Sequence, residues 1–131
     1  MNAITIRLDW PYDELSPNYR GNWRKVARYK HVYRVACKVL ALSARDGKTT
    51  YPLQAPVIGH LQFITTAMRG YDRDNFVAWM KSGIDGVADA GIVENDRDIK
   101  DWTTDVVKGA SRGVVMTLTE LEPVRIPRRS R

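Results

Sequence analysis

The sequence has almost no cysteine, the residue that forms disulfides and structural zinc sites. It has a single cysteine, Cys37, which excludes a disulfide within the chain and a structural zinc site built on two or more cysteines. A lone thiol is typical of a reducing compartment, so we expect a cytoplasmic protein. The sequence contains no apolar run of about 18 residues that could span a membrane, and residues 1–10 show no secretory signal.

Common cofactor motifs are missing too. Neither GxxxxGK[ST] nor GxGxxG occurs, so nothing favours a nucleotide cofactor held by those loops. The two histidines, His31 and His60, have no spacing to each other or to Cys37 that is typical of a metal site. A chain of 131 residues matches one domain, and we expect it to cover residues 1–124, followed by a basic, flexible tail over 125–131.

The chain does have charge, and its distribution is uneven. The net charge is +6, but residues 1–70 carry eleven basic and four acidic side chains, a net charge of +7. Residues 72–105 carry nine acidic and four basic ones, a net charge of −5. Solvated surfaces and chance produce many such asymmetries; the alternative is a polyanion-binding surface beside a cluster of metal-binding carboxylates.

The apolar pattern predicts a small α/β (α+β) fold. Strands are expected over residues 3–9, 57–68, 98–108 and 113–121, the last two joined as a hairpin through GASRG. The order β-α-β-α-β-β then implies a mixed four-stranded sheet with two main helices packed on it.

Helical spacing of apolar residues predicts those two helices over about 20–42 and 76–90. Gly91 is expected to end the second helix, and Gly83 and Gly86 to allow close packing against a neighbour. On the first helix, basic residues recur at steps of three and four and share one face. They are Arg20, Arg24, Arg28, His31, Arg34 and Lys38.

The densest polar groups are Asp72-Arg73-Asp74-Asn75 and Glu94-Asn95-Asp96. The carboxylates of Asp72, Asp74 and Asp96 could form an oxygen-only site for Mg²⁺ or Mn²⁺. In the alternative, Asp74 caps a helix and the other two are surface residues. Lys81 is equally open to two interpretations: an ordinary helix ion pair with Asp85, or a cation that neutralises a phosphate near the metal.

This pattern resembles the RusA-like Holliday junction resolvases, over roughly residues 3–121. The closing segment VVMTLTEL is similar as well. The residues that carry the resemblance are Asp72-x-Asp74-Asn75, Lys81, Asp85-Gly86, Asp89-Ala90-Gly91-Ile92 and Asn95-Asp96. Because such resolvases are common in bacteria and their phages, the resemblance also implies the cytoplasm of a bacterial or phage-infected cell.

The resemblance implies a Mg²⁺-dependent endodeoxyribonuclease that resolves four-way DNA junctions by paired phosphodiester hydrolysis in recombination and repair. Asp72, Asp74 and Asp96 would hold Mg²⁺, for which Mn²⁺ could substitute, Lys81 would be the catalytic cation, and Asn75 and Asp85 would support them. Two cuts by a chain with one site imply a homodimer. The alternatives are a nuclease of other branched or flap DNA and a non-catalytic DNA-binding protein with a structural acidic loop. The expected DNA contacts are Arg20, Arg24, Arg28, Arg34, Lys38, Arg69 and Arg73.

Overall fold

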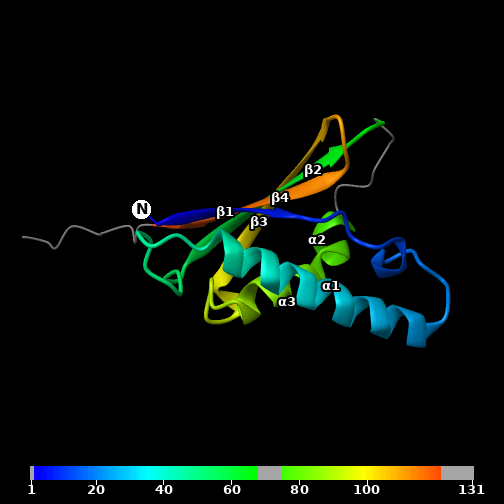
Figure 1. Ribbon diagram of the computed structural model, residues 1–131, viewed down its shortest axis with the longest axis horizontal. Helices are drawn as coiled ribbons and strands as arrows, with labels where there is room; N and C mark the ends of the chain where they lie inside the picture. Colours follow the sequence, from blue (N-terminus) through cyan, green and yellow to red (C-terminus); the bar gives the residue numbers. More distant parts are fainter. Residues whose placement is uncertain (1, 68–74, 122–131) are drawn as a thin grey trace, which may run out of the picture.

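The computed structural model describes residues 2–67 and 75–121, which form a four-stranded sheet with helices on one face (Figure 1). This confirms the predicted mixed α+β fold. Two short 3₁₀ turns, η1 (Asp13–Leu15) and η3 (Asp96–Asp98), connect the main elements. In chain order these are β1 (Ala3–Leu8), α1 (Trp23–Ala44), β2 (Val57–Thr65), α2 (Phe76–Trp79), α3 (Lys81–Asp89), β3 (Ile99–Lys108) and β4 (Gly113–Glu120).

The sheet has the strand order β1-β4-β2-β3, so the predicted hairpin between the last two strands is wrong. β2 runs parallel to β3 and antiparallel to β4, and residues 109–112 cross the end of β2. The physical reason is that β2, which alternates buried and half-buried side chains along nine residues, is an inner strand with a partner on each side. A local turn signal such as GASRG cannot reveal that a third strand lies between the two it joins.

The predicted second helix is two helices, with a break at Met80. The two helices pack against different elements of the fold. Phe76 of α2 stacks on Phe63 of β2, with ring centroids 4.0 Å apart, whereas α3 packs along α1. Met80, fully buried, leaves helical geometry between them with φ −88° and ψ 2°. One straight helix could not place its first turn on the sheet and its last two turns along α1.

The close packing predicted at the two glycines is confirmed. A Cβ atom at Gly86 would overlap the carbonyl oxygen of Arg34, and one at Gly83 would lie 2.7 Å from the ring of Tyr33. Gly91 follows α3 with φ +77°, the left-handed conformation that ends a helix. α1 itself begins at Trp23, where the side chain of Asn22 accepts a hydrogen bond from the backbone N–H of Arg24.

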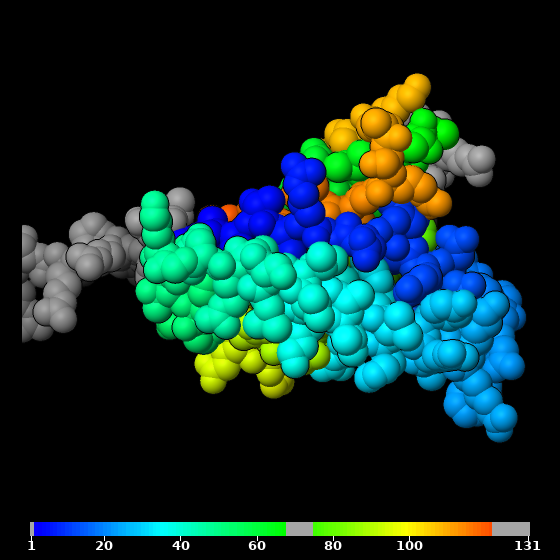
Figure 2. All heavy atoms as spheres, viewed as in Figure 1, coloured from blue at the N-terminus to red at the C-terminus, as the bar shows by residue number. Residues whose placement is uncertain are grey.

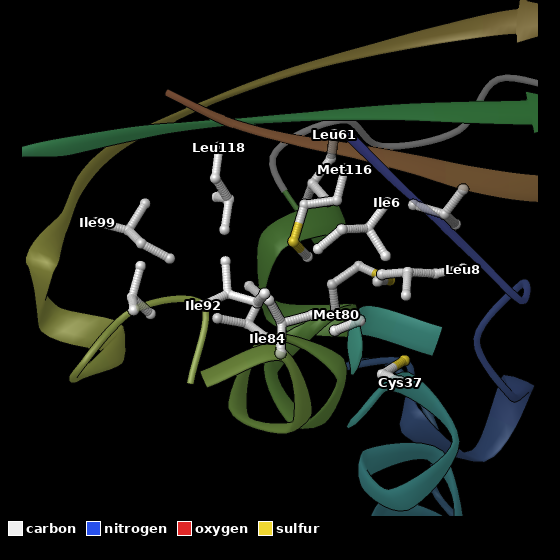
Figure 3. Close-up of a cluster of buried hydrophobic side chains, with 14 of the residues drawn as sticks. Ile6, Leu8, Cys37, Leu61, Met80, Ile84, Ile92, Ile99, Met116 and Leu118 are labelled. Carbon is white, nitrogen blue, oxygen red and sulfur yellow. The ribbon is translucent and has the colours of Figure 1, made fainter. Parts of the chain in front are cut away.

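The core lies between the sheet and the helices (Figure 3). Ile6, Met116 and Leu61, from three neighbouring strands, face Met80 and Ile84 across it. Cys37 of α1 is fully buried, and burial raises its pKa to about 12, so this thiol stays protonated at neutral pH. None of the helices in the described ranges is long and apolar enough to cross a membrane.

Candidate active site

Lys81 lies at the centre of the acidic region, between two carboxylates. Its Nζ atom donates hydrogen bonds to Asp85 Oδ1 and to Asp96 Oδ2, both at 2.8 Å. The first contact spans one helical turn, as the i,i+4 spacing indicates, but the second joins residues 15 positions apart. The lysine is therefore more than a local helix ion pair: it connects the first turn of α3 to the η3 turn.

Buried neighbours on both sides fix the position of Asp96. The preceding residues Ile92 and Val93 are fully buried, and the carbonyl of Ile92 accepts a hydrogen bond of 2.8 Å from the backbone N–H of Leu53. Ile99, just after the turn, is buried as well. The side chain of Asn95 caps η3 by accepting a hydrogen bond from the N–H of Arg97. Asp96 thus projects from a short, well-anchored turn.

The start of α2 is anchored in the same way. The stack of Phe76 on Phe63 of the inner strand β2 holds Asn75, the preceding residue, close to the sheet, and Trp79 Nε1 donates a hydrogen bond of 2.8 Å to the carbonyl of Tyr12. Asn75 lines a hollow of about 380 Å³ together with the Ser16–Tyr19 segment. A second hollow, of about 690 Å³, lies between the same segment, α1 and α2, and Lys81 is part of its wall. Concave surface therefore adjoins Asn75 and Lys81, whereas Asp85 and Asp96 line neither hollow.

The electrostatics of the site favour charged side chains. Hydrogen bonds to Asp85 and Asp96 raise the pKa of Lys81 above its usual value. The Lys81 ammonium in turn holds the pKa of Asp96 below its usual range. At neutral pH the site therefore presents the Lys81 ammonium group next to the ionised carboxylate of Asp96.

Four predicted site residues, Arg69, Asp72, Arg73 and Asp74, lie outside the described residues. Within 2–67 and 75–121, no three His, Cys, Asp or Glu side chains come close enough together to hold a metal ion. The predicted metal set depends on Asp72 and Asp74, so its geometry stays a prediction. The donor that the structure does describe, the Asp96 carboxylate, is of the oxygen type that Mg²⁺ prefers.

The predicted basic face of α1 divides into two groups. Arg24, Arg28, His31 and Lys38 are exposed to solvent, as is Arg20 just before the helix. Arg34 instead turns toward α3, where its Nε and Nη2 atoms donate to the two carboxylate oxygens of Asp89 at 2.6 and 2.8 Å. Sequence reasoning missed this pair because Asp89 is 55 positions away. One signal was available: Arg34 directly follows Tyr33, one of the apolar residues on the buried side of the predicted helix. This position indicates that Arg34 lies near the elements that pack against the helix.

We expect Arg34→Lys to destabilise the fold by about 1 kcal/mol, because lysine cannot form the two-pronged contact with Asp89 and the pair is half-exposed. Urea denaturation followed by circular dichroism measures this loss. Arg28→Lys is the control: Arg28 forms no ion pair with another described residue, so its variant should match the wild type within a few tenths of a kcal/mol. Equal losses in both variants would contradict the assigned role of Arg34.

We expect Lys81→Met to raise the pKa of Asp96. With Lys81 present, the folded pKa of Asp96 is depressed, so the stability gained from the pair is present above the unfolded pKa of about 3.9 and is lost as the pH falls through the folded value. The variant should therefore lose the part of its stability that depends on this pair at mildly acidic and neutral pH. NMR titration of the side-chain carboxyl carbons measures the pKa of Asp96 in the wild type and in the variant.

Asp46 is the internal control for this titration. Its pKa is lowered chiefly by hydrogen bonds from Thr49 in its own loop, so Lys81→Met should leave it unchanged. A pKa of Asp96 that stays low in the variant would show that Lys81 is not its cause.

Comparison with known proteins finds a relative of unknown function and does not assign a family. The chain is 28% identical over 116 residues to an uncharacterized protein of Xylella fastidiosa, a match that covers 88% of this chain and 75% of that protein. No family model matches the sequence.

Proposed function

We propose that this protein is a Mg²⁺-dependent endodeoxyribonuclease that acts on branched DNA and resolves four-way junctions by paired phosphodiester hydrolysis. The observation that carries the proposal is the contact between Lys81 and Asp96. From the sequence, one was the candidate cation and the other a candidate metal ligand, and the fold brings them together from separate elements at the most acidic part of the chain. The resemblance to RusA-like resolvases supports the same assignment.

In this proposal Asp72, Asp74 and Asp96 hold the metal ion. When bound, Mg²⁺ supplies a lowered pKa for attacking water and positive charge next to the phosphate. All three donors are carboxylate oxygens, which suit a hard cation that keeps several waters. Asn75 would support the end of the ligand segment, because Phe76 fixes the chain immediately after it.

Lys81 supplies a fixed positive charge. An ammonium group directed at the scissile phosphate stabilises the charge that develops on its oxygens in the transition state. Asp85, one turn along α3, holds the Lys81 side chain so that its orientation does not depend on substrate. The raised pKa of Lys81 keeps it charged over the whole physiological range.

The exposed basic residues at the start of α1 would hold the DNA backbone. Contacts of this kind are independent of base sequence and release counterions, so affinity should fall steeply as salt rises. Arg24→Ala should lower the slope of log affinity against log salt by about 1. Arg34 already has a carboxylate partner, Asp89, which a phosphate would have to replace.

The proposal is tested by incubating the wild-type protein with labelled four-way junction, flap and linear duplex, each with and without Mg²⁺. We expect symmetric, metal-dependent cuts in the junction and much slower cleavage of the duplex. Equal rates on all three substrates would overturn junction selectivity. Binding without cleavage in either Mg²⁺ or Mn²⁺ would favour the non-catalytic DNA-binding alternative.

A further inference from the structure

Trp23, the first residue of α1, is 72% exposed, more than any other large apolar side chain among the described residues. The remaining tryptophans, Trp10, Trp79 and Trp102, are partly buried and pack against the core. Figure 2 shows the start of α1, in light blue, projecting from the body of the molecule at the lower right. A ring that is this exposed contributes little to the core, so both its area and its aromatic face are available to a ligand.

The charge around Trp23 selects an anionic ligand. No acidic residue lies between Glu14 and Asp46 in the sequence, and Arg20 and Arg24 are exposed. The guanidinium carbon of Arg24 lies 5.4 Å from the centroid of the Trp23 ring, so a cation stands directly beside the indole. A nucleotide offers both a negative charge and a flat ring, whereas a lipid headgroup or an acidic peptide offers the charge alone. The surface therefore matches a nucleic acid whose base is accessible.

Trp23 also lies on the side of α1 that leads to the candidate active site. Steps of three and four residues place it on the same face of the helix as Val26 and Lys30. Those two residues line the hollow of about 690 Å³ whose wall includes Lys81. Trp23 thus precedes this hollow by one turn of α1. A strand that contacts Trp23 with one base can continue along the hollow toward Lys81.

We propose that the Trp23 ring stacks on an unpaired base of the bound DNA while Arg24 contacts a neighbouring phosphate. The choice of DNA rests on the proposed function, and the stacking rests on the exposure and the basic surroundings of the ring. Bases inside a duplex already stack on one another, so the indole gains a partner only in a single strand or at a branch point. Trp23 therefore adds a preference for unpaired DNA, which phosphate contacts cannot supply because they do not involve the bases.

Strands with and without bases test this inference. Fluorescence anisotropy measures the binding of labelled oligo(dT) and of an abasic strand of the same length, both in the absence of metal. We expect Trp23→Ala to bind oligo(dT) about 5- to 150-fold more weakly than the wild type, the range for loss of stacking on one base. It should bind the abasic strand as the wild type does, because that strand has phosphates but no bases. Circular dichroism checks that the variant keeps the fold.

Two further variants distinguish stacking from general apolar contact. Trp23→Phe keeps an aromatic face and should recover part of the affinity for oligo(dT), whereas Trp23→Leu should bind as weakly as Trp23→Ala. Val39→Ala is the control on the same helix. Val39 is apolar and 55% exposed but lies about four turns further along α1, so its variant should bind both strands as the wild type does.

The salt dependence of binding separates the indole from its charged neighbour. Arg24→Ala removes a charge, so it should lower the slope of log affinity for oligo(dT) against log salt by about 0.7. Trp23→Ala should weaken binding without changing this slope, because an uncharged ring releases no counterions. A slope that falls equally in both variants would mean that Trp23 acts only by positioning Arg24, and it would overturn the stacking role.

Other outcomes would also overturn the inference. They are a wild type that does not prefer oligo(dT) to the abasic strand, and a Trp23→Ala variant that binds oligo(dT) as tightly as the wild type. Unchanged DNA binding with altered sedimentation of Trp23→Ala would assign the ring to a protein contact instead. Because metal is absent, a protein that stacks bases but never cleaves would lose only the proposed nuclease function. Metal-dependent junction cleavage without a preference for bases would refute only the role of Trp23.

Discussion

Asp96→Asn should reduce Mg²⁺-dependent junction cleavage by about 10³-fold or more. The substitution removes a proposed metal ligand and also one of the two carboxylates that hold Lys81. Loss of a single group that stabilises transition-state charge typically costs 10²–10³-fold, and loss of a ligand adds weaker metal binding. Single-turnover cleavage of a labelled junction measures the effect.

The fold should survive this change. The Lys81–Asp96 pair is largely exposed, and such ion pairs contribute about 0–1 kcal/mol, so the thermal midpoint should move little. Junction binding in the absence of metal should also persist, because the basic residues of α1 are untouched. Lost cleavage with retained fold and binding would locate the defect in the chemistry.

Asp98→Asn is the matched control for Asp96→Asn. It removes the same charge from the same 3₁₀ turn, two residues later, from a side chain that makes no ion pair with Lys81. We expect its cleavage rate to remain within a few-fold of the wild type. If Asp96→Asn cleaved as well as Asp98→Asn, Asp96 could not be a metal ligand and the proposed site would be wrong.

The sequence predicted the elements of the fold better than their pairing. Alternation and helical spacing located β1, β2, β4 and α1 within a few residues, because each of these patterns arises from one buried face of a local segment. β3 was located as well, although Ile99 is its only buried residue. Strand order is a property of distant segments. β2 lies between β3 and β4, and no local signal in GASRG distinguishes this from a hairpin. The break at Met80 has the same origin, since it follows from where Phe63 and α1 lie.

In the candidate site, too, local contacts could be predicted from the sequence and long-range contacts could not. The contact of Lys81 with Asp85 follows from helix geometry alone, whereas its contact with Asp96 depends on how residues 90–95 return along the core. Arg34 shows the limit of reasoning from charge. A basic face was predicted correctly for the helix, but which of its members already has an acidic partner depends on the tertiary position of Asp89.

Gly86→Ala should destabilise the protein by about 2–3 kcal/mol, the largest effect that we expect from a single added methyl group. The new Cβ would overlap the backbone carbonyl of Arg34, and neither backbone can move as a flexible side chain would. α1 and α3 would have to separate, and because the overlap is with backbone the cost lies at the upper end of the range for overpacking a core, about 3 kcal/mol or more. Alanine gains up to about 1 kcal/mol over glycine in a helix, which offsets only part of this cost.

Thermal denaturation followed by circular dichroism measures the loss, which should lower the midpoint by on the order of 10 °C. Gly47→Ala is the control, because an added Cβ there has no atom within 4 Å, so the midpoint should stay the same or rise slightly. The close approach of Gly86 to the backbone of Arg34 also keeps the Arg34 side chain near Asp89, because that ion pair joins the same two helices. Gly86→Ala should therefore raise the depressed pKa of Asp89 as the two helices separate. A Gly86→Ala protein that melts at or above the wild-type midpoint would mean that α1 and α3 do not approach as closely as their backbones do here, and the position of Lys81 relative to α1 would have to be reconsidered.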